Sequence, residues 1–383
     1  MRDIRILFTG GGSGGHLYPL LATAEAVAKK LLKEGSPFEF HYLGPPTEHE
    51  EAFQKAGIRM HAIGAPKIRR YASGMFRNLL DIPKFFGSIF RALAKLYVLM
   101  PDAVFSKGGP GAFPVVFAAW FYRIPVLVHD SDAIPGLTNL LSGRFARRVA
   151  VSFEPAMRYF PKRKVLLTGN PVRVELLEGK MTPAQAKEAM GFRPDVSLVL
   201  ILGGSQGSER INEFVVLNLR DILGVSQVLH QTGTSNFRNI QKLSQAAMLG
   251  TSVGAEAAAG YKAVPYFEDD MAAALSAADA VVARAGSGTI FEAAAFSKPM
   301  ILIPLEESAN DHQRANAYEF ANAGGGVVIE EANLQPAILL SELRKILSDP
   351  GVHAKMSAAS AAFFRSQASE NLADALLGFI SRK

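Results

Sequence analysis

One local pattern occurs twice in this 383-residue chain: an apolar segment of strand length, a glycine-rich turn and the start of a helix. The first copy is IRILFTGGGSGGH (4–16) and the second is LVLILGGSQGSERIN (198–212). After each copy, short apolar segments alternate with helix-length ones, which is typical of parallel sheets covered by helices. The pattern predicts an α/β chain of two Rossmann-like domains in tandem.

The join between the two domains is expected near LLTGNPVRVELL (166–177), where Pro171 interrupts regular structure. We predict an N-terminal domain over residues 1–168 and a C-terminal domain over residues 169–350. Residues 351–383 are predicted to be helical and to pack back toward the N-terminal domain.

Composition excludes several classes of protein. Apolar residues make up 49% of the chain and charged residues 20%, as in a globular protein. Cysteine is absent, which removes disulfides, thiolate metal sites and a cysteine nucleophile. The start of the chain lacks the apolar core of a signal peptide, and no apolar run reaches the roughly 18 residues of a membrane-spanning helix. We therefore expect a cytosolic protein, and its net charge of +6 favours an anionic partner.

The first glycine turn allows two interpretations: a dinucleotide site, or a site at which His16 accepts a proton. Gly10, Gly12 and Gly15 satisfy the G-x-G-x-x-G pattern of dinucleotide sites, but the next strand-like segment ends in LGPP without the acidic residue that holds a ribose. His16 follows the turn at the edge where such sheets bind ligands, and its usual pKa near 6.5 suits proton abstraction. The alternatives are a dinucleotide site and a capping or packing role for His16.

Two later turns resemble phosphate sites. Ser205 and Gln206 precede a helix whose first amides are free to hold phosphate oxygens. ARAGSGTIFEAAAF (283–296) repeats the strand, turn and helix, with Glu292 placed to accept a bond from a ribose hydroxyl or to remain solvated. The polar stretch ESANDHQRANA (307–317) suits a polyhydroxy ligand, although it also fits an ordinary helix start. Asp269 and Asp270 fit a helix cap better than a metal pair, so no metal is expected.

A basic and aromatic segment over residues 67–95 has seven lysines and arginines and one acid, Asp81. Phe, Leu and Ile are interleaved at helical spacing, which predicts a helix that lies in an anionic membrane interface. An ordinary amphipathic helix packed on the sheet is the alternative. Nucleic acid is not expected as a partner, because no known binding module is present.

Together these motifs resemble the MurG family, peripheral membrane glycosyltransferases of the GT-B fold. The resemblance spans nearly the whole chain and is carried by GGGSGGHLYPLLATAEAV, RIPVLVH, AIPGLTNLLSGRFARRV, TGNPVR, GGSQGSERIN, FEDDMAAALSAADAVVARAGSGTIFEAAAFSKPMILIPL and NDHQRANA. It implies two domains that face each other across a cleft. It also implies inverting transfer of N-acetylglucosamine from UDP-GlcNAc to the 4-hydroxyl of the muramyl sugar of lipid I, which forms lipid II.

The same resemblance implies a role in peptidoglycan synthesis, and so in cell shape and division, at the cytoplasmic face of the inner membrane, without a cofactor. His16 would be the catalytic base. The acceptor would be bound by Ser13, Gly14, Gly15 and Asn139. The donor UDP-GlcNAc would be bound by Asp132, Arg173, Ser205, Gln206, Phe267, Met271, Ser287, Gly288, Thr289, Glu292, Gln313 and Asn316.

The chain departs from the family pattern at several positions. HDSD (129–132) replaces a frequent HEQN, and GGPGAFP (108–114) replaces a loop that usually contains GGY. Ser287 and Gly288 stand where a larger apolar residue is common, and His312 replaces the first of a frequent Gln-Gln pair. Three alternatives stay open: another GT-B transferase, a UDP-GlcNAc 2-epimerase, and a non-catalytic subunit that binds sugar nucleotides at the membrane.

Overall fold

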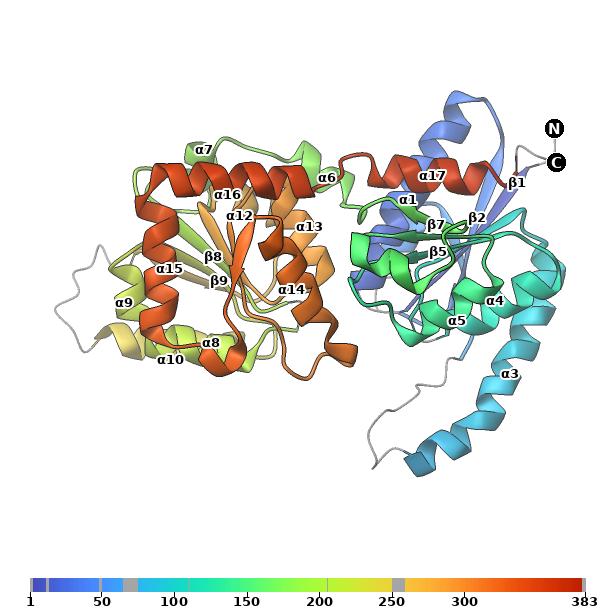
Figure 1. Ribbon diagram of the computed structural model, residues 1–383, viewed down its shortest axis with the longest axis horizontal. Helices are drawn as coiled ribbons and strands as arrows, with labels where there is room; N and C mark the ends of the chain where they lie inside the picture. Colours follow the sequence, from blue (N-terminus) through green and yellow to red (C-terminus); the bar gives the residue numbers. More distant parts are fainter. Residues whose placement is uncertain are drawn as a thin grey trace. The chain divides into compact units, whose positions relative to one another are not determined.

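The computed structural model describes residues 3–11, 14–47, 50–64, 75–109, 111–204, 206–249 and 259–380. Two of the predicted site residues, Ser13 and Ser205, lie outside this part of the chain, as do residues 67–74 of the basic segment. The chain divides into a first unit, Met1–Arg173 with Arg365–Lys383, and a second unit, Val174–Phe364. Each unit has its own parallel sheet with helices on its faces, so the predicted α/β fold of two Rossmann-like domains is confirmed (Figure 1).

The first unit, in the part that the structure describes, has a parallel sheet of seven strands in the order β3-β2-β1-β4-β5-β6-β7. The strands are β1 (Ile4–Thr9), β2 (Phe38–Gly44), β3 (Ile58–Ala62), β4 (Ala103–Ser106), β5 (Val126–Asp130), β6 (Arg148–Val151) and β7 (Val165–Leu167). The helices are α1 (Gly14–Lys33), α2 (Glu50–Lys55), α3 (Met75–Leu99), α4 (Ala112–Phe121), α5 (Leu137–Phe145), the 3-10 helix η2 (Glu154–Tyr159) and α17 (Ala368–Leu377).

Both faces of this sheet are buried, which explains why its strands are apolar without alternation. On β1, Ile6 and Phe8 pack into a core with residues of α1 and α17, whereas Leu7 points to the other face and packs with residues of α3 and α4. The carboxyl ends of the parallel strands all lie at one edge of the sheet. The loops that follow β1, β4 and β5 therefore come together there.

The second unit repeats this architecture. Its described residues form a parallel sheet of six strands in the order β10-β9-β8-β11-β12-β13. The strands are β8 (Leu198–Leu202), β9 (Gln227–Gln231), β10 (Tyr261–Val264), β11 (Ala280–Ala283), β12 (Met300–Leu302) and β13 (Gly326–Val328). The helices are α6 (Val174–Glu178), α7 (Pro183–Ala189), α8 (Glu209–Leu217), α9 (Leu219–Leu223), α10 (Phe237–Leu249), α12 (Met271–Ala277), α13 (Ser287–Ala295), η3 (Ala309–Asp311), α14 (His312–Asn322), η4 (Glu331–Asn333), α15 (Pro336–Ser348) and α16 (Pro350–Phe363).

The C-terminal helices are shared between the two units. The division falls after Arg173 rather than at the predicted residue 168, and α16 stays in the second unit, where it contacts α13 and α15. Only α17 packs on the first unit, beside α1 (Figure 1). Its Leu372 and Leu376 enter the core of the first unit, and Lys30 Nζ lies 2.7 Å from Asp374 Oδ1. The predicted segment 351–383 is thus two helices with different neighbours.

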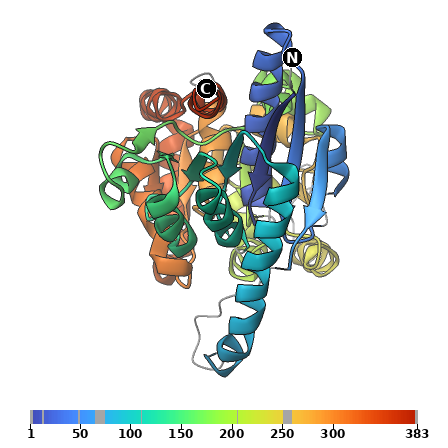
Figure 2. The same cartoon turned by 90° about the vertical axis from the view of Figure 1, so that its right-hand side faces the viewer.

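The long helix α3 presents two different sides. Toward α4 it buries Ala92 and Leu96, whereas Phe86, Phe90 and Tyr97 are 55%, 70% and 69% exposed. Figure 2 shows that α3 extends beyond the sheet of its unit. No helix in the described residues has the length and apolar character needed to cross a bilayer.

Candidate functional site

His16 lies in the first turn of α1, close to the loops that follow β1 and β4. Two glycines leave room for its imidazole. A Cβ on Gly11 would lie 3.1 Å from His16 Nδ1, and one on Gly109 would lie 2.8 Å from His16 Nε2. Gly109 has a φ of +83°, so a side chain there would be disfavoured by both space and backbone conformation. Gly11 and Gly109 therefore leave the space that the His16 imidazole occupies.

A buried polar network lies at the same edge of the sheet. Lys107 directly follows β4 and is 3% exposed, and Asp130 ends β5 and is 2% exposed. Lys107 Nζ donates a hydrogen bond to Ser131 Oγ, which donates to Asn170 Oδ1 at 2.7 Å. Asn139 Nδ2 donates to Asp130 Oδ2 at 2.8 Å. Because polar groups this deeply buried are costly without partners, these bonds fix the loop after β5.

The electrostatic environment keeps His16 neutral. Burial, and then the positive charge of Lys107, lower the pKa of His16 to about 4, while the negative charge of Asp132 acts in the opposite direction. A neutral imidazole has one ring nitrogen that carries no proton and can accept one. At neutral pH, His16 is thus in the protonation state that a proton acceptor requires.

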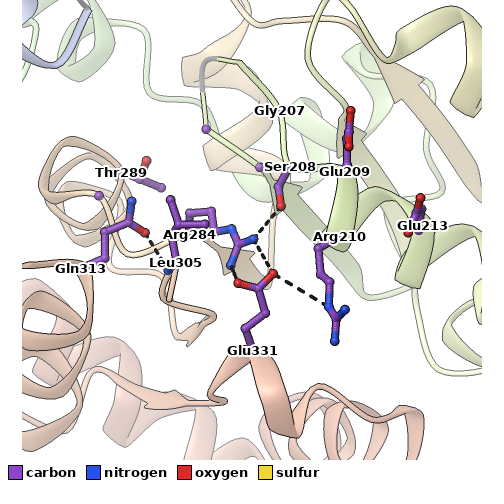
Figure 3. A pocket seen from close by; sticks show the side chains of 13 residues that line it. Gly207, Ser208, Glu209, Arg210, Glu213, Arg284, Thr289, Leu305, Gln313 and Glu331 are labelled. Atoms are coloured by element: carbon purple, nitrogen blue, oxygen red, sulfur yellow. Dashed lines mark hydrogen bonds and ion pairs between the residues drawn. The ribbon is translucent and has the colours of Figure 1, made fainter. Parts of the chain in front are cut away.

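A pocket of about 570 Å³ lies in the second unit (Figure 3). It is lined by the glycine turn after β8, by the first residues of α8 and by Gly286 and Thr289 at the start of α13. The first turn of each helix brings backbone amides and the positive end of a helix dipole to this pocket, and in α8 the Ile211 amide is bonded to Ser208 Oγ at 3.4 Å. The pocket combines two features that bind anions, and nucleotide phosphates are anions of suitable size.

Arg284 organises one wall of this pocket. It directly follows β11 and is 8% exposed. Its Nη2 donates to Ser208 Oγ at 2.8 Å and to Glu331 Oε1 at 2.9 Å, and its Nη1 donates to Glu331 Oε2 at 3.0 Å. Figure 3 shows the guanidinium between the two partners. Ser208 is also the N-cap of α8, so Arg284 links the start of that helix to η4.

Comparisons with known proteins find similarity to glycosyltransferases over both units. Residues 6–151 match the glycosyltransferase family 28 N-terminal domain, and residues 198–372 match the glycosyltransferase family 28 C-terminal domain. The UDP-N-acetylglucosamine–N-acetylmuramyl-(pentapeptide) pyrophosphoryl-undecaprenol N-acetylglucosamine transferase of Clostridium kluyveri is 36% identical over 344 residues, which cover 89% of this chain and 91% of the relative. The enzyme of the same name from Treponema denticola is 32% identical over 396 residues, covering 99% of this chain and 98% of the relative.

The chain belongs to glycosyltransferase family 28, and within it to the MurG family. The crystal structure of MurG from Acinetobacter baumannii has a TM-score of 0.71 at 25% identity and covers 98% of this chain and 100% of its own. The UDP-GlcNAc 2-epimerase of Neisseria meningitidis has a TM-score of 0.67 at 15% identity, covering 99% of this chain and 100% of its own, which shows a shared fold alone. The expected GT-B fold is confirmed.

The family resemblance assigned residues of the first unit to both substrates. Gly14 and Gly15 begin α1, and Gly15 is exposed, so the backbone is accessible there. Asn139 is buried beside Asp130. Asp132 and Arg173, assigned to the donor, both belong to the first unit, where the guanidinium of Arg173 lies 4.3 Å from the centroid of the Tyr18 ring. The role of each in substrate binding stays a prediction.

The MurG resemblance assigned several donor-binding residues to the second unit. Some of them line the pocket, and others lie near it without lining it. Thr289 and Gln313 line it, whereas Gln206 is exposed on the glycine turn. Ser287 and Gly288 begin α13, one turn before the half-buried Glu292. Asn316 is fully buried, and its Nδ2 donates to the carbonyl oxygen of Ala285 at 3.2 Å.

Phe267 and Met271 are largely buried at the loop after β10 and the start of α12. Gln231 joins this loop to the glycine turn. Its Oε1 accepts from the Phe267 amide at 3.1 Å, and its Nε2 donates to the carbonyl oxygen of Gly204 at 3.0 Å. Gln231 therefore holds two segments that the family pattern assigns to one nucleotide.

Sequence reasoning missed the charged residues that organise both regions of this family 28 chain. Lys107, Asp130 and Arg284 each stand at the carboxyl end of a buried strand, in DAVFSK, PVLVHD and DAVVAR. That position was a usable signal, because ligands bind at this edge of parallel sheets. The signal did not reveal the partners, since Arg284 pairs with a residue 47 positions away.

Proposed function

We propose that this protein transfers N-acetylglucosamine from UDP-GlcNAc to the 4-hydroxyl of the muramyl sugar of lipid I and so forms lipid II. The observation that carries the proposal is the match to enzymes named for this reaction, at 32–36% identity over both units. The anion-binding character of the pocket in the second unit supports the donor half of the reaction. The neutral His16 at the first glycine turn supports the acceptor half.

In the proposed mechanism, His16 accepts the proton of the acceptor 4-hydroxyl as its oxygen attacks the anomeric carbon of the donor. Attack from the face opposite UDP inverts that centre and gives a β-linked product. The bond from the anomeric carbon to the diphosphate breaks, and UDP leaves with the electron pair. Amides at the start of α13 would stabilise the charge that develops on the diphosphate.

We propose that the donor's parts are held by different elements of the second unit. The uracil would lie beside Phe267–Met271, the ribose hydroxyls would be bound by Glu292, and the sugar hydroxyls by Gln313. Asn316 would act through the turn before α13, which its buried amide supports. Gly14, Gly15 and the buried Asn139 would form the acceptor's diphosphate and sugar site.

Transfer of labelled N-acetylglucosamine from UDP-GlcNAc to a lipid I analogue tests the proposed function. We expect a lipid-linked disaccharide and one UDP released for each transfer, and we expect transfer to continue in EDTA, because protein amides would stabilise the leaving diphosphate. Conversion of the donor to UDP-N-acetylmannosamine without transfer would instead favour the epimerase. Donor binding with neither reaction would favour a non-catalytic subunit.

We also propose that the protein docks on the cytoplasmic face of the plasma membrane through α3, where the lipid acceptor is held, and thereby serves cell-wall synthesis, cell shape and division. Support comes from the exposed Phe86, Phe90 and Tyr97, interspersed with the exposed cations Lys84, Arg91 and Lys95. Aromatic side chains enter the interface, and cations are attracted to anionic headgroups by about 1 kcal/mol each.

Vesicle co-sedimentation tests this docking. The double variant Phe86→Ser/Phe90→Ser is expected to bind vesicles with anionic lipids at least about tenfold more weakly, because burial of each ring contributes about 1.5–3 kcal/mol. Changing Lys84, Arg91 and Lys95 to Glu should abolish the preference for anionic over zwitterionic vesicles. Leu217→Ser is the matched control, since Leu217 is 84% exposed in the second unit and should not affect binding. Equal binding by all variants would remove α3 as the docking element.

A further inference from the structure

We propose that Lys107 is the positioning residue of the acceptor site, an assignment that rests on the proposed function. Its buried ammonium group holds the loop after β5 in place and supplies the positive charge that balances the acidic residues around His16.

Lys107 is connected to the loop after β5 by hydrogen bonds. Its Nζ donates to Ser131 Oγ, and Ser131 is anchored in turn to Asn170. In the same loop, Asp130 Oδ1 accepts from the Asp132 amide at 3.0 Å and Oδ2 accepts from the Gly136 amide at 3.3 Å. Lys107 also lies beside the first glycine turn: its amide donates to the carbonyl oxygen of Thr9 at 2.8 Å, and a Cβ on Gly10 would lie 3.3 Å from Lys107 Cβ. Lys107 thus connects the ends of β1 and β4 through its backbone and the loop after β5 through its side chain.

Four titratable groups face Lys107 from the elements packed around it. His16 lies on α1, His129 and Asp130 on β5, and Asp132 on the loop that follows. Burial raises the pKa of Asp130, and the negative charge of Asp132 raises it further, whereas Lys107 lowers it. Without a cation, two neighbouring carboxylates would repel each other in a poorly solvated site. Lys107 therefore keeps the acidic loop charged and ordered.

Burial of Lys107 costs free energy that a purely structural role in holding the loop would not require. Desolvation of an ammonium group costs several kcal/mol, and an apolar side chain of the same length would fill the space at lower cost. A purely structural role needs only a hydrogen-bond donor to Ser131. The positive charge has a use only where it acts on neighbouring charges, which here include the candidate catalytic base.

The sign of the effect on His16 follows from this arrangement. A cation repels a proton, so Lys107 lowers the pKa of His16, as it does that of His129. Removal of the cation raises the pKa of His16 and that of Asp130 together. A base works only when unprotonated, so the acid limb of kcat/KM for the acceptor should then move to higher pH.

NMR titration of the His16 ring protons in the full chain tests the inference without using activity. In Lys107→Met the pKa of His16 should rise by about one unit or more, the usual effect of one nearby charge. Lys107→Gln keeps a donor for Ser131 but removes the charge, so it should give the same shift. If His16 keeps its wild-type pKa in both variants, the inference is wrong. If the pKa of His16 shifts in Lys107→Met but not in Lys107→Gln, Lys107 acts only as a structural hydrogen-bond donor.

Kinetics provide the second readout. Because the pKa of His16 would rise from about 4 to about 5, both variants should lose kcat/KM for the acceptor mainly below about pH 5, with a loss that approaches about tenfold below about pH 4. The loss from this cause should be small at pH 7, and the donor KM should stay within about twofold. Lys298→Met is the matched control: Lys298 Nζ donates to the carbonyl oxygens of Ser276 and Ala278 in the second unit, and burial lowers its pKa to about 8. Lys298→Met should lower Tm without moving the pKa of His16.

The two proposals can fail separately. If the wild-type protein transfers no sugar to lipid I, the proposed function fails, while the NMR titration of His16 still tests the role of Lys107.

Discussion

We expect His16→Ala to lower kcat for transfer to a lipid I analogue by at least about a hundredfold, the usual scale for a lost general base. The variant should bind UDP-GlcNAc with a Kd within about twofold of the wild-type value. The donor pocket is lined by residues of the second unit, and His16 belongs to the first. Single-turnover kinetics and calorimetric titration with the donor measure the two quantities separately.

The control for this substitution is another histidine of the first unit. His61 lies on β3 with its Nε2 3.2 Å from His41 Nδ1, and it has no proposed role in the site. His61→Ala should leave kcat unchanged. Near-normal turnover in His16→Ala would remove His16 as the base and direct attention to Asp130.

Arg284→Met should lower the free energy of unfolding by about 3–5 kcal/mol, the usual cost of removing one partner of a buried ion pair. The side chain of Glu331 is 12% exposed and would be left without the two bonds that Arg284 donates to its carboxylate. Ser208 would lose a donor at the start of α8 as well, so the affinity for UDP-GlcNAc should fall. Chemical denaturation measures the first effect and calorimetric titration the second.

Two further variants identify the cause of that loss. Arg210 also approaches Glu331, but it is 63% exposed and 3.9 Å away, so Arg210→Met should cost less than about 1 kcal/mol. The double variant Arg284→Met/Glu331→Leu should regain much of the lost stability, because no buried charge remains unpaired. If Arg210→Met and Arg284→Met lower the free energy of unfolding equally, burial of the Arg284–Glu331 pair does not explain the loss of stability.

Much of the fold was predictable because it depends on patterns within short segments. The apolar segments predicted parallel strands with two buried faces, and the glycine turns predicted the edge at which each sheet binds ligands. His16 was recognisable because a histidine directly after such a turn stands at that edge. The motifs at 283–296 and 307–317 likewise predicted elements around the pocket, where Thr289 and Gln313 are found.

Other features were not predictable, because they depend on which distant residues meet. The segment 351–383 looked like one helical region, but the apolar side chains of α17 fit the first unit, whereas α16 packs on α13 and α15 of the second. The sequence also does not show that Asn316 is fully buried with its amide on the Ala285 carbonyl. Burial and pairing are properties of packing.

By itself, the sequence determined that this chain forms two Rossmann-like domains, each with a glycine turn, and that a histidine follows the first turn. Only the tertiary structure decided which charged side chains lie near these turns and which of them pair. Lys107 follows β4 and Asp130 ends β5, two strands that become neighbours in the sheet, and Glu331 reaches Arg284 only after β13 joins β12. The reason is physical: desolvation and Coulomb energies depend on distances in the folded chain, whereas strand, turn and helix preferences are local.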